Sequence, residues 1–143
     1  PAIDAVHPAT LDPLAAALTA AGRPVSRQGT SDLAVTLPEG TRKVSGNALR
    51  VRRRAVLYHG TLLDNFPLEL IGTLLRHPPR EPAYRQRRSH EAFLANLALG
   101  RDQIDAAVRA AFEAERDEHD WPRQQAETLV ASRYGQRSWT ERL

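Results

Sequence analysis

Three prolines within five residues, at positions 78, 79 and 82, divide this chain of 143 residues into two parts. Proline lacks a backbone N–H and disfavours helical geometry in the residue before it, so neither a helix nor a central strand can run through this segment. Alternating apolar residues precede the prolines, whereas apolar residues recur at helical spacing from Ser89 onward. We therefore expect an α+β fold, with a mostly antiparallel sheet and helices over residues 1–85 and an α-helical segment over 86–143.

The first part opens with a helix. Leucines at helical spacing in an alanine-rich stretch predict a helix over residues 11–21, which Thr10 caps and Gly22-Arg23-Pro24 ends. These leucines are Leu11, Leu14 and Leu18.

Two strands are expected after this helix. Strict alternation over residues 33–37 predicts a half-buried strand, and Pro38-Glu39-Gly40 predicts the turn that follows it. The next strand begins with Lys43 and Val44. Gly46 interrupts its pattern, which predicts a bulge or a close approach by another chain segment.

A second apolar run, over residues 56–63, is expected to pair with this strand as an antiparallel hairpin that turns near Arg53 and Arg54. Asn65 then caps a short helix with Pro67 in its first turn. Only about four strands are expected, which is few for a sheet that stands alone.

The second part is expected to be free of strands. A short helix is predicted over His90–Leu97, with Gly100 as its stop. An apolar stripe from Ile104 to Phe112 predicts a helix of about 15 residues, and Trp121-Pro122 opens a further one.

Composition excludes several classes of function. The chain has no cysteine, which removes disulfides, thiolate metal sites and cysteine nucleophiles. No apolar run approaches the length of a membrane span and no signal peptide opens the chain, so we expect no membrane association and a cytoplasmic location. The net charge of +3 favours acidic partners without naming one.

The chain has a single lysine, Lys43, among nineteen arginines. A lysine ammonium is a compact point charge on a flexible stem, whereas arginine is a rigid fork. A site that places one cation between a carbonyl and a phosphoryl oxygen favours the former. The alternative is that Lys43 is a chance residue of an arginine-rich composition.

Small polar residues surround Lys43 and suggest a binding groove. Ser45-Gly46-Asn47-Ala48 would let a bound group approach the backbone closely, and His59-Gly60-Thr61 lies opposite on the expected hairpin. The alternative is structural: paired glycines ease strand twist, and His59 is a half-buried histidine with satisfied hydrogen bonds.

These segments resemble the lipoate–protein ligase A family of the biotin/lipoate ligase superfamily. The resemblance rests on Ser31-Asp32-Leu33, on Arg42 through Ala48, on Leu57 through Leu63, and on Arg87 through Leu97. The Lys-x-Ser-Gly-x-Ala and His-Gly-Thr elements occur together at the spacing found in that family.

The resemblance implies a partial biotin/lipoate ligase-like catalytic domain that uses ATP and Mg²⁺. Its members form a lipoyl- or octanoyl-adenylate and pass the acyl group to a lysine of a lipoyl carrier domain. Lys43 matches the catalytic lysine, and Asp32 matches an acidic residue near the phosphates and magnesium. Matches to the adenylate loop are Ser45, Gly46, Asn47 and Ala48, and matches to the facing strand are His59, Gly60 and Thr61.

The sequence departs from the family in two respects. Ser31 stands where the family has asparagine, and the upstream Arg-Arg-x-x-Gly-Gly-Gly element that wraps the acyl chain is missing. The chain also begins at Pro1 and contains no methionine. We therefore expect the C-terminal part of the catalytic domain, with an N-terminal half or a complementing subunit as partner. Octanoyl transferases that work through an acyl-thioester need a cysteine nucleophile, so adenylate chemistry is favoured.

Two other interpretations remain open. Two clusters of arginines, at positions 50, 52, 53 and 54 and at 85, 87 and 88, could form a non-catalytic nucleic-acid-binding module. The small net charge, few aromatic residues and lack of a known motif argue against nucleic acid, and favour arginines in a solvated hairpin tip and loop. The other interpretation is a non-catalytic fragment that needs a partner to complete its site.

Overall fold

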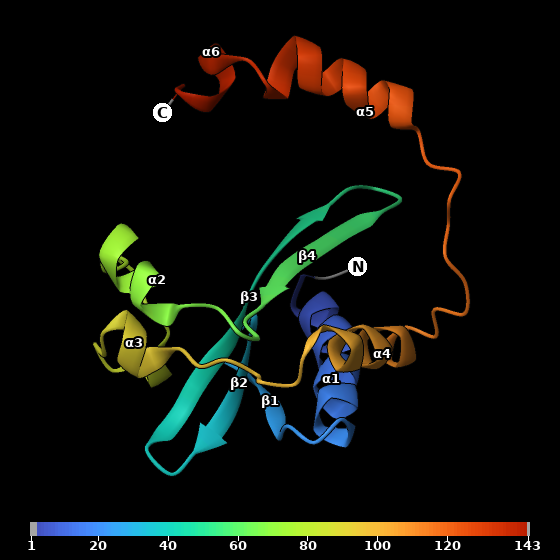
Figure 1. Cartoon of the computed structure of the whole chain (residues 1–143). Coiled ribbons are helices and arrows are strands. Elements are labelled where there is room, and N and C mark those ends of the chain that lie inside the picture. The colour runs from blue at the N-terminus through green and yellow to red at the C-terminus, as the bar shows by residue number, and fades with distance from the viewer. Residues whose placement is uncertain (1–2, 143) are drawn as a thin grey trace.

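A computed structural model describes residues 3–142, so Pro1 lies outside the described residues. Four antiparallel strands form one sheet in the order β1-β2-β3-β4, with β1 and β4 at its edges (Figure 1). The strands are β1 (Val25–Gln28), β2 (Asp32–Leu37), β3 (Gly40–Val51) and β4 (Val56–Leu62). The mixed α+β class predicted from the sequence is confirmed.

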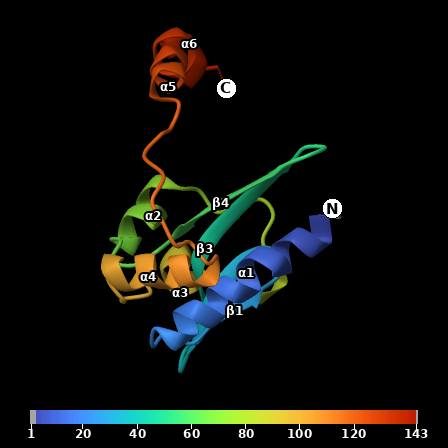
Figure 2. The same cartoon turned by 90° about the vertical axis from the view of Figure 1, so that its right-hand side faces the viewer.

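Helices flank the sheet on both sides. One side carries α1 and α4, which pack against each other, and the other side carries α2 and α3 (Figures 1 and 2). The helices and helical turns are α1 (Ile3–Ala20), α2 (Leu68–Leu74), the 3₁₀ turn η1 (Ala83–Arg85), α3 (His90–Phe93), α4 (Arg101–Ala111), α5 (Arg123–Leu129), the π-helical turn η2 (Val130–Tyr134) and α6 (Arg137–Thr140).

Helix α1 begins earlier than predicted, at Ile3, and Thr10 lies inside it rather than at its cap. Val6 and His7 are buried, so the extra turns bury side chains against the rest of the fold and offset the backbone bonds that two internal prolines remove. The end is as predicted: Gly22 has φ +101°, and the N–H of Arg23 donates to the carbonyl of Leu18, as in a Schellman motif.

At Gly46 the sequence predicted a bulge or a close approach by another segment, but the bulge of β3 lies at Val44. The β2–β3 ladder pairs Leu33 with Ser45 but Ala34 with Lys43, which leaves Val44 as the extra residue. Val44 is fully buried. Burial of this apolar side chain in the core explains why the extra residue lies there and not at the glycine.

The predicted turn at residues 38–40 and the β3–β4 hairpin are confirmed. Gly40 has φ +114°, and the hairpin closes between Arg52 and Ala55, whose N–H and carbonyl are joined at 2.8 Å. Strand β1 was not predicted, because four residues directly after Pro24 are too few to show a period.

Helix α2 forms as predicted, but its N-cap is Pro67 and no side chain caps it, so the prediction for Asn65 is wrong. The helix predicted over His90–Leu97 ends at Phe93. The following residues are extended, because their N–H groups donate to the sheet: Ala95 to the Lys43 carbonyl at 2.9 Å and Leu97 to the Leu63 carbonyl at 2.7 Å.

The core lies between the sheet and the pair α1 and α4. The three leucines predicted from helical spacing are buried in it, together with Leu33 and Val35 of β2. Burying a leucine or valine side chain contributes roughly 1.5–3 kcal/mol to folding. Helix α4 is shorter than predicted, and Phe112 at its C-cap is 47% exposed.

Residues 121–142 form the helical segment expected after Trp121-Pro122, and it stands away from the sheet (Figures 1 and 2). Helices α5 and α6 have no buried residue. Across residues 3–142, no helix is both long and apolar enough to cross a membrane. The division of the chain near residue 85 stays a prediction.

Candidate active site

Lys43 is held by a carboxylate on the neighbouring strand. Its Nζ lies 2.7 Å from Oδ1 of Asp32. The side chains of the two residues are 24% and 11% exposed, so the pair is largely removed from water. Leu33 and Val35 face the core, so the alternation of β2 turns Asp32 toward the opposite face of the sheet, where Lys43 meets it.

A second residue fixes the same carboxylate from the other side. The hydroxyl of Tyr84 donates to Oδ2 of Asp32 at 2.8 Å, and the Tyr84 ring packs 5.1 Å from the ring of Phe93. Burial, together with the hydrogen bond to the Asp32 carboxylate, raises the pKa of Tyr84, so the phenol remains a donor. Asp32 is therefore bonded through both oxygens.

The residues expected to line the adenylate as a loop belong to strand β3. Alternation separates them: Gly46 and Ala48 share the face of Lys43, whereas Ser45 and Asn47 turn toward α1. The side-chain amide of Asn47 donates to the Ser45 hydroxyl and to the Ser31 carbonyl, both at 2.7 Å. Asn47 therefore ties β3 to the start of β2.

The sequence predicted that the segment around Gly60 lies opposite the segment around Gly46 on the hairpin, and this pairing is confirmed. Gly60 pairs with Asn47, Thr61 with Gly46, and His59 with Ala48. At Gly60 a Cβ would overlap Oδ1 of Asn47 and come 2.9 Å from the Gly46 carbonyl oxygen. Gly60 thus leaves room for the Asn47 side chain.

Gly46 meets no comparable constraint. A Cβ at Gly46 would have Thr61 Oγ1 and Lys43 Cε as its nearest neighbours, at 3.9 and 4.0 Å. The absence of a side chain at Gly46 instead keeps space open beside the Lys43 side chain.

Two hollows lie against these strands. The first, of about 290 Å³, is bounded by Lys43, Ser45, Gly46 and Thr61, and by the apolar Leu63, Ile71, Leu75, Phe93 and Leu94. The second, of about 200 Å³, lies toward α1 and is lined by Asn47, His59 and Gly60, with Ser45 and Thr61 again. We call the first the Lys43 hollow. It combines a largely apolar wall with two cations, Lys43 and Arg85.

The predicted residues are thus partly brought together. Lys43, Ser45, Gly46 and Thr61 share the Lys43 hollow, and Asp32 contacts Lys43. The remaining predicted residues lie elsewhere: Asn47, His59 and Gly60 line the second hollow, and Ala48 lines neither.

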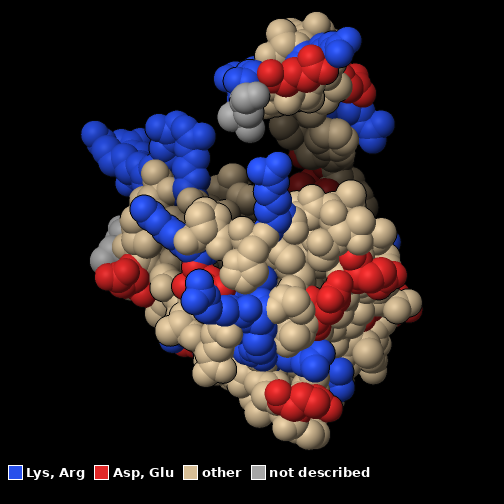
Figure 3. Space-filling view, turned by 90° about the vertical axis from the view of Figure 1, so that its left-hand side faces the viewer, with Lys and Arg blue, Asp and Glu red and all other residues tan. Residues whose placement is uncertain are grey.

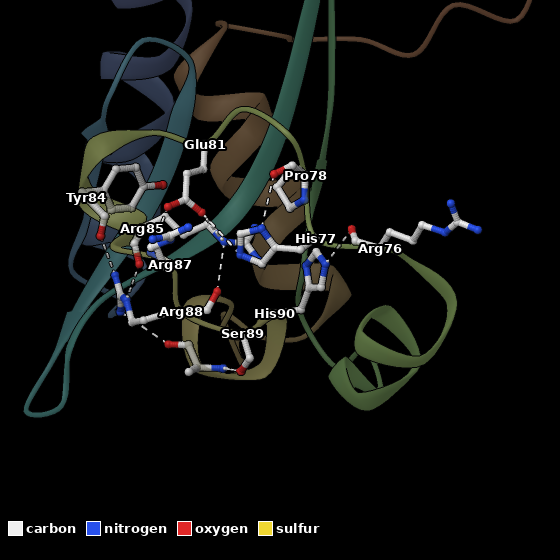
Figure 4. Close-up of polar contacts among 11 residues, drawn as sticks. Arg76, His77, Pro78, Glu81, Tyr84, Arg85, Arg87, Arg88, Ser89 and His90 are labelled. Carbon is white, nitrogen blue, oxygen red and sulfur yellow. Dashed lines mark hydrogen bonds and ion pairs between the residues drawn. The ribbon is translucent and has the colours of Figure 1, made fainter.

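Three further residues of the Lys43 hollow were not expected from the sequence: Arg85, His90 and Phe93. Arg85 ends the η1 turn, whereas His90 and Phe93 belong to α3. Figure 4 shows Arg85 and His90. Neither the helical pattern nor the family resemblance assigned these three residues a place in the site, because tertiary contacts bring them to the hollow. The hydrogen bond from Tyr84 to Asp32 was not predicted, for the same reason.

The second predicted arginine cluster is not a solvated loop. Arg85 is 4% exposed, and Arg88 donates to the carbonyls of Tyr84 at 2.7 Å and Thr41 at 2.9 Å. These guanidinium groups hold the loop in place, and only Arg87 of the three is exposed. The first cluster is exposed at the β3–β4 tip, as expected.

Within residues 3–142, no group of three or more His, Cys, Asp or Glu side chains gathers as a metal site would. Asp32 already accepts from Lys43 and Tyr84. Mg²⁺ commonly takes one or two carboxylates together with substrate phosphates. The donor set therefore fits the metal only as part of a magnesium–nucleotide complex, and a metal role of Asp32 stays a prediction.

Comparison with known proteins finds both a family and individual relatives. The family model "Lipoyl protein ligase A/B catalytic domain" matches residues 4–114. A lipoate-protein ligase A of Bdellovibrio bacteriovorus is 34% identical over 90 residues, which is 59% of this chain and 26% of that protein. The chain thus spans about a quarter of the length of this curated relative.

Two solved structures from Thermoplasma acidophilum share the fold. A bipartite lipoate protein ligase, described with its E2 lipoyl domain, has a TM-score of 0.80 at 18% identity, over 97% of this chain and 58% of its own. A putative lipoate protein ligase with bound lipoic acid has a TM-score of 0.74 at 15% identity, over 99% and 60%. These two structures show the shared fold. The family match over residues 4–114 shows that the chain belongs to the lipoyl protein ligase A/B catalytic-domain family.

Proposed function

We propose that this chain is part of an ATP-dependent lipoate–protein ligase. The enzyme joins lipoate or octanoate to AMP and passes the acyl group to a lysine of a lipoyl carrier domain. The observation that carries the proposal is Lys43, paired with Asp32 in the wall of a largely apolar hollow.

Lys43 suits the charge that develops in the first step. A carboxylate oxygen of the acid attacks the α-phosphorus of ATP, a new P–O bond forms, and the bond to pyrophosphate breaks. Negative charge accumulates on the phosphoryl oxygens in the transition state. A fixed ammonium in a site shielded from water stabilises that charge far more than it would in bulk water.

The same cation suits the second step. The amine of the carrier lysine attacks the acyl carbonyl carbon, AMP leaves with the electron pair of the broken C–O bond, and the nitrogen loses a proton. Lys43 can stabilise the negative charge that forms on the carbonyl oxygen. No covalent enzyme intermediate is needed, in agreement with the absence of cysteine.

Asp32 and Tyr84 position Lys43. A lysine side chain has four rotatable bonds, so a fixed partner is needed to keep its ammonium at one place. Asp32 supplies that partner, and Tyr84 restrains Asp32. Bound Mg²⁺ would neutralise charge on the ATP phosphates, and Asp32 is the residue proposed to hold it.

The remaining predicted residues support the pocket. Gly46 keeps the backbone close to the bound group, and Ser45 and Thr61 line the same hollow. We propose that His59, Gly60, Asn47 and Ala48 shape the adjoining surface of β3 and β4, where the hairpin register sets them opposite one another.

The activity is proposed to need a further part of the catalytic domain, as an N-terminal half or a separate subunit. This proposal is supported by the partial coverage of all three relatives and by the bipartite ligase from Thermoplasma. The lipoyl carrier domain is the proposed acyl acceptor, because that bipartite ligase is described with one.

ATP–pyrophosphate exchange tests the proposal. The chain is assayed alone and together with the N-terminal half of a related ligase, with lipoate and octanoate as separate acids. We expect exchange only in the complemented protein and only when an acid is present. A complemented, folded protein that supports exchange with neither acid would rule out adenylate formation.

A further inference from the structure

Arg85 is a buried cation in the wall of the Lys43 hollow. Although its guanidinium is permanently charged, the residue is only 4% exposed. Its Nε donates to the Arg88 carbonyl at 3.1 Å. Its Nη2 is buried and makes no hydrogen bond to any of residues 3–142. Buried polar groups normally have a partner, so this one calls for an explanation.

Packing keeps Arg85 in this position. Its guanidinium carbon lies 4.8 Å from the centroid of the Phe93 ring, and Phe93 lines the same hollow. Tyr84, which holds Asp32, packs on that ring as well. The two cations of the hollow are therefore attached to one connected group of side chains.

Arg85 is also paired less closely than Lys43. Its Nε lies 3.5 Å from Oε2 of Glu81, compared with 2.7 Å for the Lys43–Asp32 pair. Glu81 is shared among further donors: its Oε1 accepts from the backbone of Arg87 at 2.9 Å, and its Oε2 lies 3.4 Å from His77 Nε2 (Figure 4). Oε2 itself makes no hydrogen bond. Glu81 therefore leaves part of the guanidinium fork unused.

We propose that Arg85 binds an oxyanion of the ligand that occupies the Lys43 hollow. The oxyanion is the carboxylate of the acyl acid or a phosphate of the nucleotide, and a guanidinium fork is suited to either. Lys43 binds at the other cationic position of the same hollow. The identity of the ligand rests on the proposed function, whereas oxyanion binding at Arg85 is tested without it.

Isothermal titration calorimetry of the full chain is the test, with octanoate, AMP and pyrophosphate as separate probes. Octanoate reports a carboxylate site, and the other two report a phosphate site. We expect Arg85→Gln to weaken binding of at least one probe by tenfold or more. Arg87→Gln is the matched control, because the Arg87 side chain is exposed. This variant should bind each probe with the affinity of the unchanged chain.

Glu81→Gln gives a prediction of opposite sign. Removing the competing carboxylate charge should strengthen binding of the same probe several-fold, while Gln keeps an Oε1 acceptor for the Arg87 N–H. A merely structural Arg85–Glu81 pair predicts no gain. This variant also decides the question if Arg85→Gln fails to fold, as judged by circular dichroism.

The proposal is overturned if the unchanged chain binds none of the probes saturably, or if Glu81→Gln leaves affinity unchanged. It is also overturned if a folded Arg85→Gln binds like Arg87→Gln. Failure of pyrophosphate exchange while these affinity changes are observed would count against the ligase proposal alone. Active exchange without them would count against Arg85 alone.

Discussion

The basic residues of the Lys43 hollow and those of the β3–β4 tip differ in burial and in ion pairing. In the hollow, Lys43 and Arg85 are largely buried, and each has a carboxylate partner. At the tip, Arg50, Arg52, Arg53 and Arg54 are exposed, and no ion pair joins them to any described residue; the tip is the projecting blue group in Figure 3. Burial makes a partner necessary, because an unpaired charge away from water is costly.

This comparison predicts that substitutions in the two regions differ by several kcal/mol. Asp32→Ala should have the largest effect, lowering the free energy of unfolding by about 3 kcal/mol. That is the lower end of the range for breaking a buried ion pair, since Lys43 keeps some exposure. Urea denaturation followed by circular dichroism measures it.

A second variant isolates the pair. Adding Lys43→Ala to Asp32→Ala should recover part of the loss, because no uncompensated ammonium remains. A double variant that loses the sum of both single effects would mean that the two side chains do not interact.

Gly60→Ala comes next, with an expected loss of about 2 kcal/mol in unfolding free energy from overpacking. The new methyl group would overlap Asn47 Oδ1 and approach the Gly46 carbonyl. Gly46→Ala is the matched control on the paired strand, where a methyl group meets nothing closer than 3.9 Å. Equal losses for the two alanine variants in urea denaturation would refute this distinction.

Tyr84→Phe should lower the unfolding free energy by about 1.5 kcal/mol, because Asp32 loses a donor while the ring still packs on Phe93. The fold raises the pKa of Tyr84 above its ordinary value of 10.0. The contribution is therefore complete below pH 10 and is lost as pH rises above it, when the unfolded phenol ionises.

Unfolding measured at pH 7 and pH 11 tests this dependence. The difference between Tyr84→Phe and the unchanged chain should shrink at the higher pH. A larger difference in unfolding free energy at pH 11 would contradict the claim that protonated Tyr84 donates to Asp32.

The smallest effect is expected at the tip. Arg53→Gln with Arg54→Gln should change unfolding free energy by less than about 0.5 kcal/mol, because exposed charges without partners contribute little. Thermal unfolding measures it. A loss above 1 kcal/mol would show that the tip is as dependent on its charges as the hollow.

Elements with long local patterns could be predicted from the sequence. The leucine spacing of α1, the alternation of β2 and the β3–β4 hairpin all depend on residues close together in the chain. The failures depend on distant partners. Residues 94–97 are extended because their N–H groups donate to the carbonyls of Lys43 and Leu63. Helix α1 extends to Ile3 because the added turns bury Val6 and His7.

In the candidate site, too, residues set by local patterns could be predicted, whereas residues placed by distant contacts could not. Lys43 and its facing strand follow from composition, spacing and family resemblance, and the hairpin brings them together. Tyr84 and Arg85 follow from none of these. They reach the hollow through a loop whose course is set by Phe93 and by the bonds of Arg88 to Thr41 and Tyr84.

The most direct test of the central claim is pyrophosphate exchange by the complemented protein carrying Lys43→Ala. We predict a loss of about 10²-fold or more in exchange rate, the size expected when a preorganised charge-stabilising group is removed. Circular dichroism and assembly with the N-terminal half should be checked in the same samples. An assembled Lys43→Ala protein that exchanges pyrophosphate at the rate of the unchanged protein would contradict the account.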